Sequence, residues 1–169
     1  MKTIPPICLT AALCLCFAAR ALCGEPGWTT DYAKAVEQAK TENKALLLDF
    51  TGSDWCEWCM QMKTETLDKP AFKDYAAKNF VLVEVDFPQH TPQSGAVKAQ
   101  NQKLLQKYQV SGFPSFIILS KTEKLLGRQD GYLEGGPTAF LAELRKFYRP
   151  PAGSSEAAPA DDFDSFFKK

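Results

Sequence analysis

The sequence predicts an α/β fold in which a central mixed sheet is flanked by helices. Apolar runs of strand length alternate with segments of helical spacing along the chain. Such alternation is typical of a sheet with helices on both faces. The last two expected strands are close enough in sequence to form a hairpin, so the sheet is expected to contain antiparallel as well as parallel pairs.

The bulk composition fits one globular domain with a hydrophobic core. Of the 169 residues, 45% are hydrophobic and 24% are charged, which is the usual profile of a globular protein of this size. The formal net charge is 0, whereas a protein that follows nucleic-acid phosphates carries a basic excess. The composition therefore argues against nucleic-acid binding.

The expected elements of the first half follow from the spacing of apolar residues. Apolar positions recur at helical intervals through 31–43, after Thr30 as the capping residue. The run 45–50 is apolar apart from Asp49, as in a central strand covered on both faces. In chain order we expect a helix over 31–43, a strand over 45–50, a loop over 51–55, helices over 56–67 and 70–79, and a strand over 80–86.

The second half is expected to add a helix, a hairpin and a final helix. Gly131 should end the hairpin, and Pro137 suits the first turn of the last helix. The expected elements are a loop over 88–95, a helix over 96–108, a strand over 113–120, a turn over 121–123, a strand over 124–128 and a helix from 137. The residues expected to be buried on the two helices are Val97, Leu104 and Tyr108, and Phe140, Leu141, Leu144 and Phe147.

Residues 1–23 have the layout of a secretory signal peptide. Lys2 precedes an apolar stretch over 7–19, and Ala19-Arg20-Ala21 offers a cleavage site. The stretch is shorter than the roughly 20 residues that span a bilayer, although an anchoring N-terminal helix and cleavage after Cys23 are alternatives. A lipoprotein anchored at Cys23 is not expected, because Leu22 is too bulky for such a site. We expect a periplasmic or secreted protein whose domain covers 24–149.

From Pro150 the composition changes to that of a flexible C-terminal tail, 150–169. Residues 150–160 are rich in Pro, Ala, Gly and Ser and cannot bury much surface. The tail ends with Phe163, Phe166 and Phe167 among acidic residues. Two interpretations stay open: the tail folds back onto its own domain, or it is a docking motif for a partner.

The cysteine pattern indicates redox chemistry. With the signal peptide removed, the domain keeps Cys56 and Cys59, and it also keeps Cys23 if cleavage falls after Ala21. The other cysteines, Cys8, Cys14 and Cys16, lie in the signal. A disulfide between Cys56 and Cys59 would close a tiny loop and stabilise the fold little. In an exported protein such a pair is more readily explained by thiol–disulfide exchange.

The position of the pair assigns a different role to each cysteine. Cys56 is expected at a helix N-terminus, where unpaired N–H groups and the helix dipole favour the thiolate, which is the nucleophile. Cys59 follows nearly one turn later on the same face and is expected to resolve the mixed disulfide. Because the electrons reside on the two sulfurs, we expect no dissociable cofactor.

Metal binding is the main alternative use of the pair. Zinc usually takes four ligands, and the domain adds only His90, to which we assign no role. Covalent haem attachment needs a histidine after the second cysteine, where Met60 stands. Met60 and Met62 beside the thiols could hold Cu(I), although such methionines are usually core filler. We expect no metal, and a copper chaperone or a structural disulfide remains an alternative.

Over residues 28–148 the chain resembles the thioredoxin superfamily, in particular its secreted bacterial branch. The resemblance rests on Leu48-Asp49-Phe50, Trp55-Cys56-Glu57-Trp58-Cys59, Val110-Ser111-Gly112-Phe113-Pro114 and Gly131. It implies a thioredoxin-like fold and a thiol–disulfide oxidoreductase that acts on proteins through mixed disulfides. Two features depart from the family pattern: the segment from Asp49 to Cys56 is one residue longer than usual, and Glu57-Trp58 replaces the Gly-Pro of thioredoxin.

The resemblance also implies roles for residues around the pair. A buried acid at the place of Asp49 takes the proton of the resolving cysteine in this family, and burial would raise its pKa as that role requires. Pro114 matches the family's cis-proline, which lies opposite the cysteines, where it and Phe113 leave backbone free to pair with substrate. Trp55 and Trp58 flank the thiols and are both expected to bind substrate. Trp55 is also expected to pack against the domain, and Trp58 to be exposed.

Charges near Cys56 predict the direction of electron flow. Asp54 and Glu57 place negative charge near the sulfur, which disfavours the very stable thiolate of a strong oxidant. We therefore expect a reductase or isomerase, with a dithiol oxidase as the alternative. The expected partners are protein thiols and disulfides and an upstream membrane electron donor, and the protein is expected to be a monomer.

Overall fold

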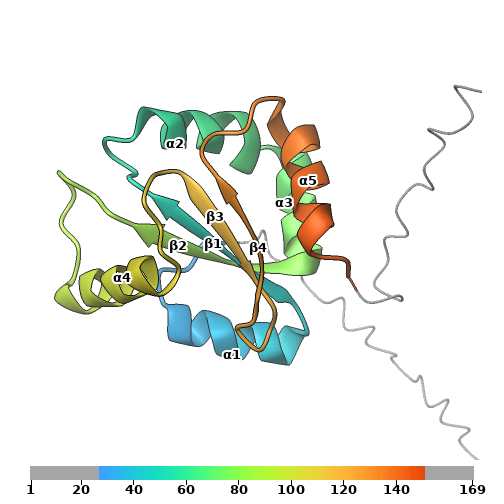
Figure 1. Cartoon of the computed structure of the whole chain (residues 1–169), viewed down its shortest axis with the longest axis horizontal. Helices are drawn as coiled ribbons and strands as arrows, with labels where there is room; N and C mark the ends of the chain where they lie inside the picture. The colour runs from blue at the N-terminus through green and yellow to red at the C-terminus, as the bar shows by residue number, and fades with distance from the viewer. Residues whose placement is uncertain (1–26, 151–169) are drawn as a thin grey trace, which may run out of the picture.

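The computed structural model describes residues 27–150 and confirms a central mixed sheet flanked by helices (Figure 1). Four strands pair in the order β2-β1-β3-β4. β1 (Ala45–Thr51) runs parallel to β2 (Phe80–Asp86) and antiparallel to β3 (Ser115–Leu119). β3 pairs antiparallel with β4 (Leu125–Asp130), which confirms the expected hairpin.

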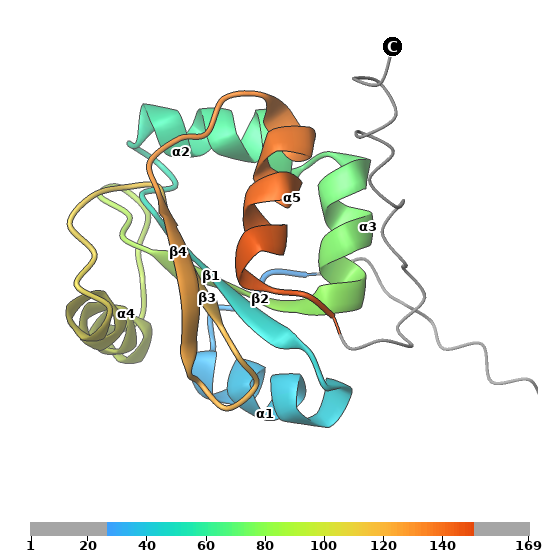
Figure 2. The ribbon, with the colours of Figure 1, turned by 45° about the vertical axis from the view of Figure 1, so that its right-hand side comes forward.

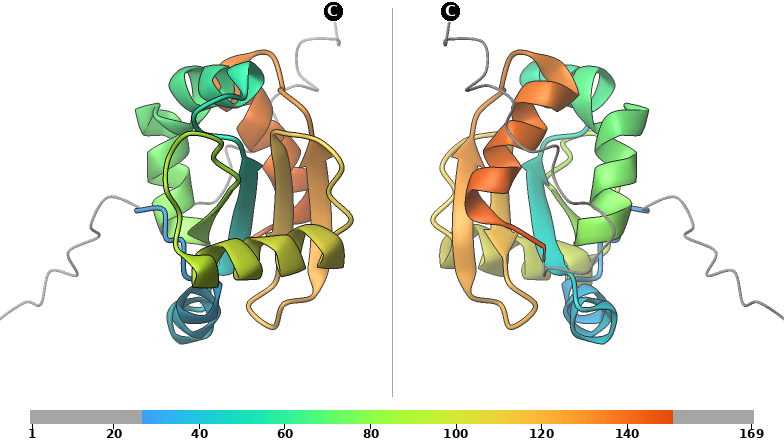
Figure 3. Two further views of the ribbon diagram at one scale, coloured as in Figure 1. Left: turned by 90° about the vertical axis from the view of Figure 1, so that its left-hand side faces the viewer. Right: turned by 90° about the vertical axis from the view of Figure 1, so that its right-hand side faces the viewer.

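Helices cover both faces of this sheet. α1 and α4 lie on one face, and α2, α3 and α5 lie on the other, as the opposite views of Figure 3 show. Figure 2 shows α3 and α5 side by side. The helical elements are α1 (Tyr32–Glu42), α2 (Glu57–Met62), the π-helical segment η1 (Lys63–Leu67), α3 (Pro70–Asn79), α4 (Gly95–Lys107) and α5 (Gly136–Phe147).

The core consists of two apolar clusters separated by the sheet. Every residue of β1 is buried, and its side chains alternate between the clusters because successive residues of a strand point to opposite faces. Leu47 packs with Phe72 of α3 and Phe140 of α5, whereas Leu48 packs on the other side with Val36 of α1. This two-sided burial explains why the run 45–50 is continuously apolar around Asp49.

The start of α1 differs from the expectation. The N-cap is Asp31 rather than Thr30, and its carboxylate accepts a hydrogen bond from the Lys34 N–H at 3.1 Å. Both residue types suit this position, but Thr29, just upstream, forms a parallel bridge to Val83 of β2. This pairing keeps the chain extended past Thr30, so the cap falls one residue later.

The segment predicted as one helix over 56–67 changes its geometry part-way. Cys56 is the N-cap, α2 begins at Glu57, and the turns widen into the π-helical η1 from Lys63. Thr66 and Leu67, which follow each other in η1, are both buried. π-Helical turns are rare and often occur at functional sites.

The other differences are shifts at element ends. α4 begins at Gly95 after a Ser94 cap, and its buried residues are Asn101 and Leu104, whereas Val97 and Tyr108 are only half-buried. β3 is shorter than predicted, because the strand begins only after Pro114, and Phe147 of α5 is half-buried. β4 covers 125–130 rather than the predicted 124–128, and α5 begins one residue earlier than predicted, at Gly136. Gly131, which was expected to end the hairpin, has a φ of 78° just after β4.

Some predictions concern parts of the chain outside the described residues. These are the signal peptide over 1–23 with Cys8, Cys14, Cys16 and Cys23, and the tail over 150–169 apart from Pro150, with Phe163, Phe166 and Phe167. Between residues 27 and 150, no helix is long and apolar enough to cross a membrane.

Replacing Gly127 with alanine is expected to destabilise the fold. A Cβ at Gly127 would lie 2.2 Å from the Phe147 ring, so α5 would have to move away from β4. Overpacking of this kind destabilises by about 1–3 kcal/mol, which urea unfolding should detect. Gly95→Ala is the matched control, because its Cβ would meet nothing within 4 Å. Equal stability of the two variants would contradict this close packing.

Candidate active site

Cys56 and Cys59 form a disulfide at the junction between the loop after β1 and helix α2. The two sulfurs are 2.05 Å apart and the two Cα atoms 5.2 Å apart. Cys56 caps α2, and the backbone N–H of Cys59 donates to its Sγ at 3.2 Å. Both residues are nearly buried, with exposed fractions of 7% for Cys56 and 5% for Cys59. The capping position gives the Cys56 sulfur the helix-end environment that favours a thiolate.

Asp49 lies on β1, on the sheet face that α2 and η1 cover. It is 8% exposed, and its Oδ1 atom has no hydrogen-bond partner. Burial, followed by the nearby carboxylates of Glu84 and Asp86, raises the pKa of Asp49 to about 8. The structure thus confirms the burial of Asp49 that the sequence predicted, and the direction of the pKa shift follows from that burial.

The acids that surround Asp49 were missed by the sequence analysis. Glu84 is the register partner of Asp49 across the β1–β2 pair, and its own pKa is raised by burial and by Asp86. Lys63 acts in the opposite direction and lowers both pKa values, while its Nζ pairs with Asp68 at 2.7 Å. Strand register brings Asp49 and Glu84 together, so spacing along the chain gave no signal for this group.

The loop before Cys56 is fixed to the segment after β2. The Asp54 carboxylate accepts hydrogen bonds from the backbone N–H groups of Gln89, His90 and Thr91 at 2.8–2.9 Å. These bonds lower the pKa of Asp54 to about 2, so the residue carries its negative charge at neutral pH. Asp54 is therefore charged, as predicted, and its carboxylate binds the backbone of residues 89–91. His90 takes part only through its backbone.

Trp55 packs against the domain, as predicted, but 40% of it stays exposed. Its Nε1 donates to the Phe87 carbonyl at 2.8 Å, and its ring meets that of Phe113 with centroids 6.0 Å apart. A Cβ at Gly52 would lie 2.5 Å from the indole, so glycine is needed where the ring crosses the loop. The Phe113–Pro114 peptide bond is cis, which confirms that prediction. The residue before Cys56 therefore touches the segment that contains Pro114.

Trp58 lies exposed beside a second aromatic residue that the sequence analysis did not single out. Trp58 is 56% exposed, as predicted, and its ring lies 5.4 Å from that of Tyr132, centroid to centroid. The Tyr132 hydroxyl donates to Glu65 of η1. Tyr132 directly follows Gly131, one of the motif residues, and that position was the only signal that could have indicated it.

The two methionines near the cysteines do not form a joint site. Met60 is 43% exposed, whereas Met62 is fully buried in the core cluster with Phe72 and Phe140. The two thioethers therefore lie in different environments, one exposed and one in the core. They do not support the copper site that their spacing suggested. Within residues 27–150, no group of three or more His, Cys, Asp or Glu side chains could hold a metal ion.

Comparison with known proteins places this site in a family. Residues 32–148 match the model of the thioredoxin-like domain. The chain belongs to the thioredoxin-like family. It is 36% identical over 149 residues to the disulfide bond reductase DsbH of Chlamydia pneumoniae, a match that covers 82% of this chain and 89% of that protein.

Solved structures agree with this assignment. The structure titled DsbH oxidoreductase superposes with a TM-score of 0.68 at 36% identity, over 73% of this chain and 84% of that one. A thioredoxin from Thermus thermophilus superposes with a TM-score of 0.55 at 25% identity, over 73% and 87% of the two chains. The protein is a thioredoxin-like thiol–disulfide oxidoreductase, and its redox pair is Cys56–Cys59.

Proposed function

We propose that the protein reduces disulfide bonds of other proteins outside the cytoplasm. The observation that carries the proposal is the Cys56–Cys59 pair at the start of α2, on the side of the sheet where Asp49 is buried with a raised pKa. The 36% identity to a disulfide bond reductase supports the direction of the reaction. The signal-like residues 1–23 support export to a periplasm or secretion.

The reaction begins from the reduced pair. The Cys56 thiolate attacks one sulfur of the substrate disulfide, whose bond breaks, and the other substrate sulfur leaves as a thiolate that takes up a proton. A mixed disulfide now joins Cys56 to the substrate. The Cys59 thiol loses its proton, attacks the Cys56 sulfur and releases the second substrate thiol. Two electrons have passed to the substrate, and the pair is left in the oxidised form that the structure shows.

Asp49 is the proposed base for the Cys59 proton. An acid with a pKa of about 8 is close in strength to an ordinary cysteine thiol, whose pKa is about 8.5. Proton transfer between groups of matched pKa is efficient near the operating pH. An exposed aspartate would be too weak a base for this step.

The two aromatic groups flank the pair and are the proposed substrate contacts. Trp58 with Tyr132 and Trp55 with Phe113 present ring surface at the ends of the cysteine segment. Pro114 follows Phe113 and completes the proposed substrate-binding set. Rings of this kind suit an extended polypeptide with apolar side chains. We propose that the protein works as a monomer and receives electrons from a membrane-bound donor.

Insulin reduction tests this function. The protein, reduced beforehand and freed of small thiols, should precipitate the insulin B chain in proportion to its own dithiol content, since each pair donates two electrons once. A copper determination on the same preparation tests the rival chaperone function. An inactive protein that carries one copper ion per chain would overturn the proposal.

A further inference from the structure

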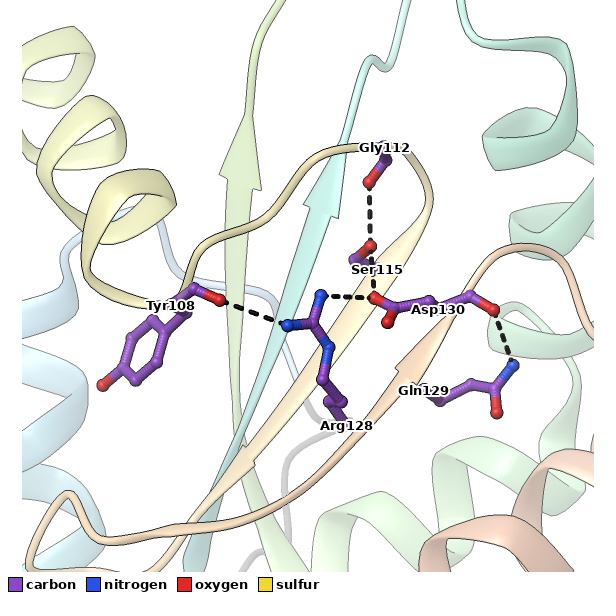
Figure 4. A network of polar contacts seen from close by, with 6 residues as sticks. All are labelled: Tyr108, Gly112, Ser115, Arg128, Gln129 and Asp130. Carbon is purple, nitrogen blue, oxygen red and sulfur yellow. Dashed lines mark hydrogen bonds and ion pairs between the residues drawn. The ribbon is translucent and has the colours of Figure 1, made fainter.

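β4 and the residue after it hold the segment between α4 and β3 at three points, and Figure 4 shows the first two. The Arg128 Nη1 donates to the carbonyl of Tyr108, the C-cap of α4, at 3.3 Å. The Ser115 hydroxyl lies 2.8 Å from the Gly112 carbonyl and 2.9 Å from Oδ1 of Asp130. The Gly131 N–H donates to the Pro114 carbonyl at 2.8 Å. The segment 109–114 is thus fixed at its start, middle and end.

Asp130 links the first two of these points. Its Oδ1 accepts from the Arg128 Nη2 at 2.7 Å as well as from Ser115, and the Arg128 hydrogen bond lowers the pKa of Asp130. Ser115 is 2% exposed and is the register partner of Asp130. A hydroxyl has one hydrogen, so Ser115 shares it between the carboxylate and the Gly112 carbonyl. The carboxylate therefore couples Arg128 to the middle of the segment.

The held segment reaches the redox pair through Phe113. Its ring meets Trp55, the residue before Cys56, and stacks on Phe87 with centroids 5.2 Å apart. A movement of residues 112–114 would therefore move the proposed substrate contacts relative to Cys56. The sulfur atoms themselves have their own supports in α2, among them the Cys59 N–H.

We infer that Ser115 and Asp130, with Arg128, are positioning residues that hold the 112–114 backbone in place for polypeptide substrates. This inference rests on the proposed function, since it assumes that the backbone beside Phe113 and Pro114 binds the substrate. The three side chains act through that backbone and take no part in electron transfer. They set the affinity for protein disulfides and leave the chemistry of the sulfurs unchanged.

The test compares a protein disulfide with a small one. Ser115→Ala should raise the KM for insulin about 5-fold at unchanged kcat, the factor that corresponds to a hydrogen bond of about 1 kcal/mol. Its rate with the small disulfide DTNB and its reduction potential should stay unchanged. Ser115→Thr, which keeps the hydroxyl, should restore the KM. Asp130→Asn should act in the same direction as Ser115→Ala, and the double variant should show less than the product of the two effects.

Controls separate this role from a merely structural one. Ser120→Ala removes a hydroxyl at the other end of the β3–β4 hairpin and should leave the insulin KM unchanged. Should Ser115→Ala fail to fold, Arg128→Gln, at a partly exposed position, carries the same test. An unchanged insulin KM, or equal losses with insulin and DTNB, would overturn the inference. A wild-type protein that reduces DTNB but never insulin would instead overturn the proposed function.

Discussion

Cys59→Ser is expected to stop the reaction at the mixed disulfide, and Cys56→Ser is expected to abolish it. In the first variant Cys56 still attacks, but no thiol is left to release the substrate, so covalent complexes accumulate. In the second variant the nucleophile at the start of α2 is missing, and turnover should fall to the uncatalysed background. Non-reducing gels and insulin turnover measure the two outcomes.

Labelling of the reduced wild-type protein checks the same assignment. Limiting iodoacetamide at neutral pH should modify Cys56 before Cys59, because the helix N-terminus favours its thiolate. Met60→Leu is a useful control, since this exposed side chain has no part in the proposed steps and should leave both assays unchanged. Preferential labelling of Cys59, or complexes trapped by Cys56→Ser, would reverse the roles of the two cysteines.

Asp49→Asn is expected to slow release of the mixed disulfide by about 10²-fold, the lower end of what a general base contributes. In the wild-type protein the release rate should rise with pH through about 8, because Asp49 acts as a base only when ionised. The variant should lose this step in the pH profile. Single-turnover kinetics between pH 6 and 9 would show the difference, and identical profiles would contradict the proposed role.

Asp49→Asn should stabilise the folded protein, although it slows release of the mixed disulfide. The pKa of Asp49 is about 8 in the folded protein and 3.8 in the reference state, so between these values the folded form binds the extra proton. Stability therefore falls as pH rises from about 4 to 8 and stays low above that range. Asp49→Asn removes this penalty, and its melting temperature should exceed the wild-type value most clearly at pH 8 and above. Asp74→Asn, at an exposed position of α3, is the control for loss of a carboxylate.

The sequence predicted the central residues of the site, namely the cysteine pair, Asp49 and Pro114, better than the residues around them. An acid inside an otherwise apolar run can only be buried or at a strand end, and this made Asp49 visible. The cysteine spacing, together with the signal-like residues 1–23, indicated the redox pair but left metal binding and a structural disulfide as alternatives. The cis bond at Pro114 came from the resemblance alone, because composition and spacing cannot distinguish cis from trans.

The features that were missed depend on contacts between distant segments. Glu84 meets Asp49 only through the β1–β2 register, and Tyr132 meets Trp58 only because the turn after β4 lies beside α2. Asp54 was correctly expected to be charged, but its three backbone donors come from a loop more than 30 residues away. Asp31 replaced Thr30 as the helix cap because a bridge to β2 extends the preceding segment.

The reduction potential of Cys56–Cys59 tests the central claim most directly. Asp54 and Glu57 near Cys56 disfavour a very stable thiolate, and a one-unit rise in thiol pKa corresponds to about 30 mV for a two-electron couple. Equilibration in glutathione buffers should give a value nearer the roughly −270 mV of thioredoxin than the roughly −120 mV of DsbA. The Cys56 pKa, titrated alongside, should be about 7 or above. A potential above about −150 mV would contradict the reductase and make the protein a dithiol oxidase.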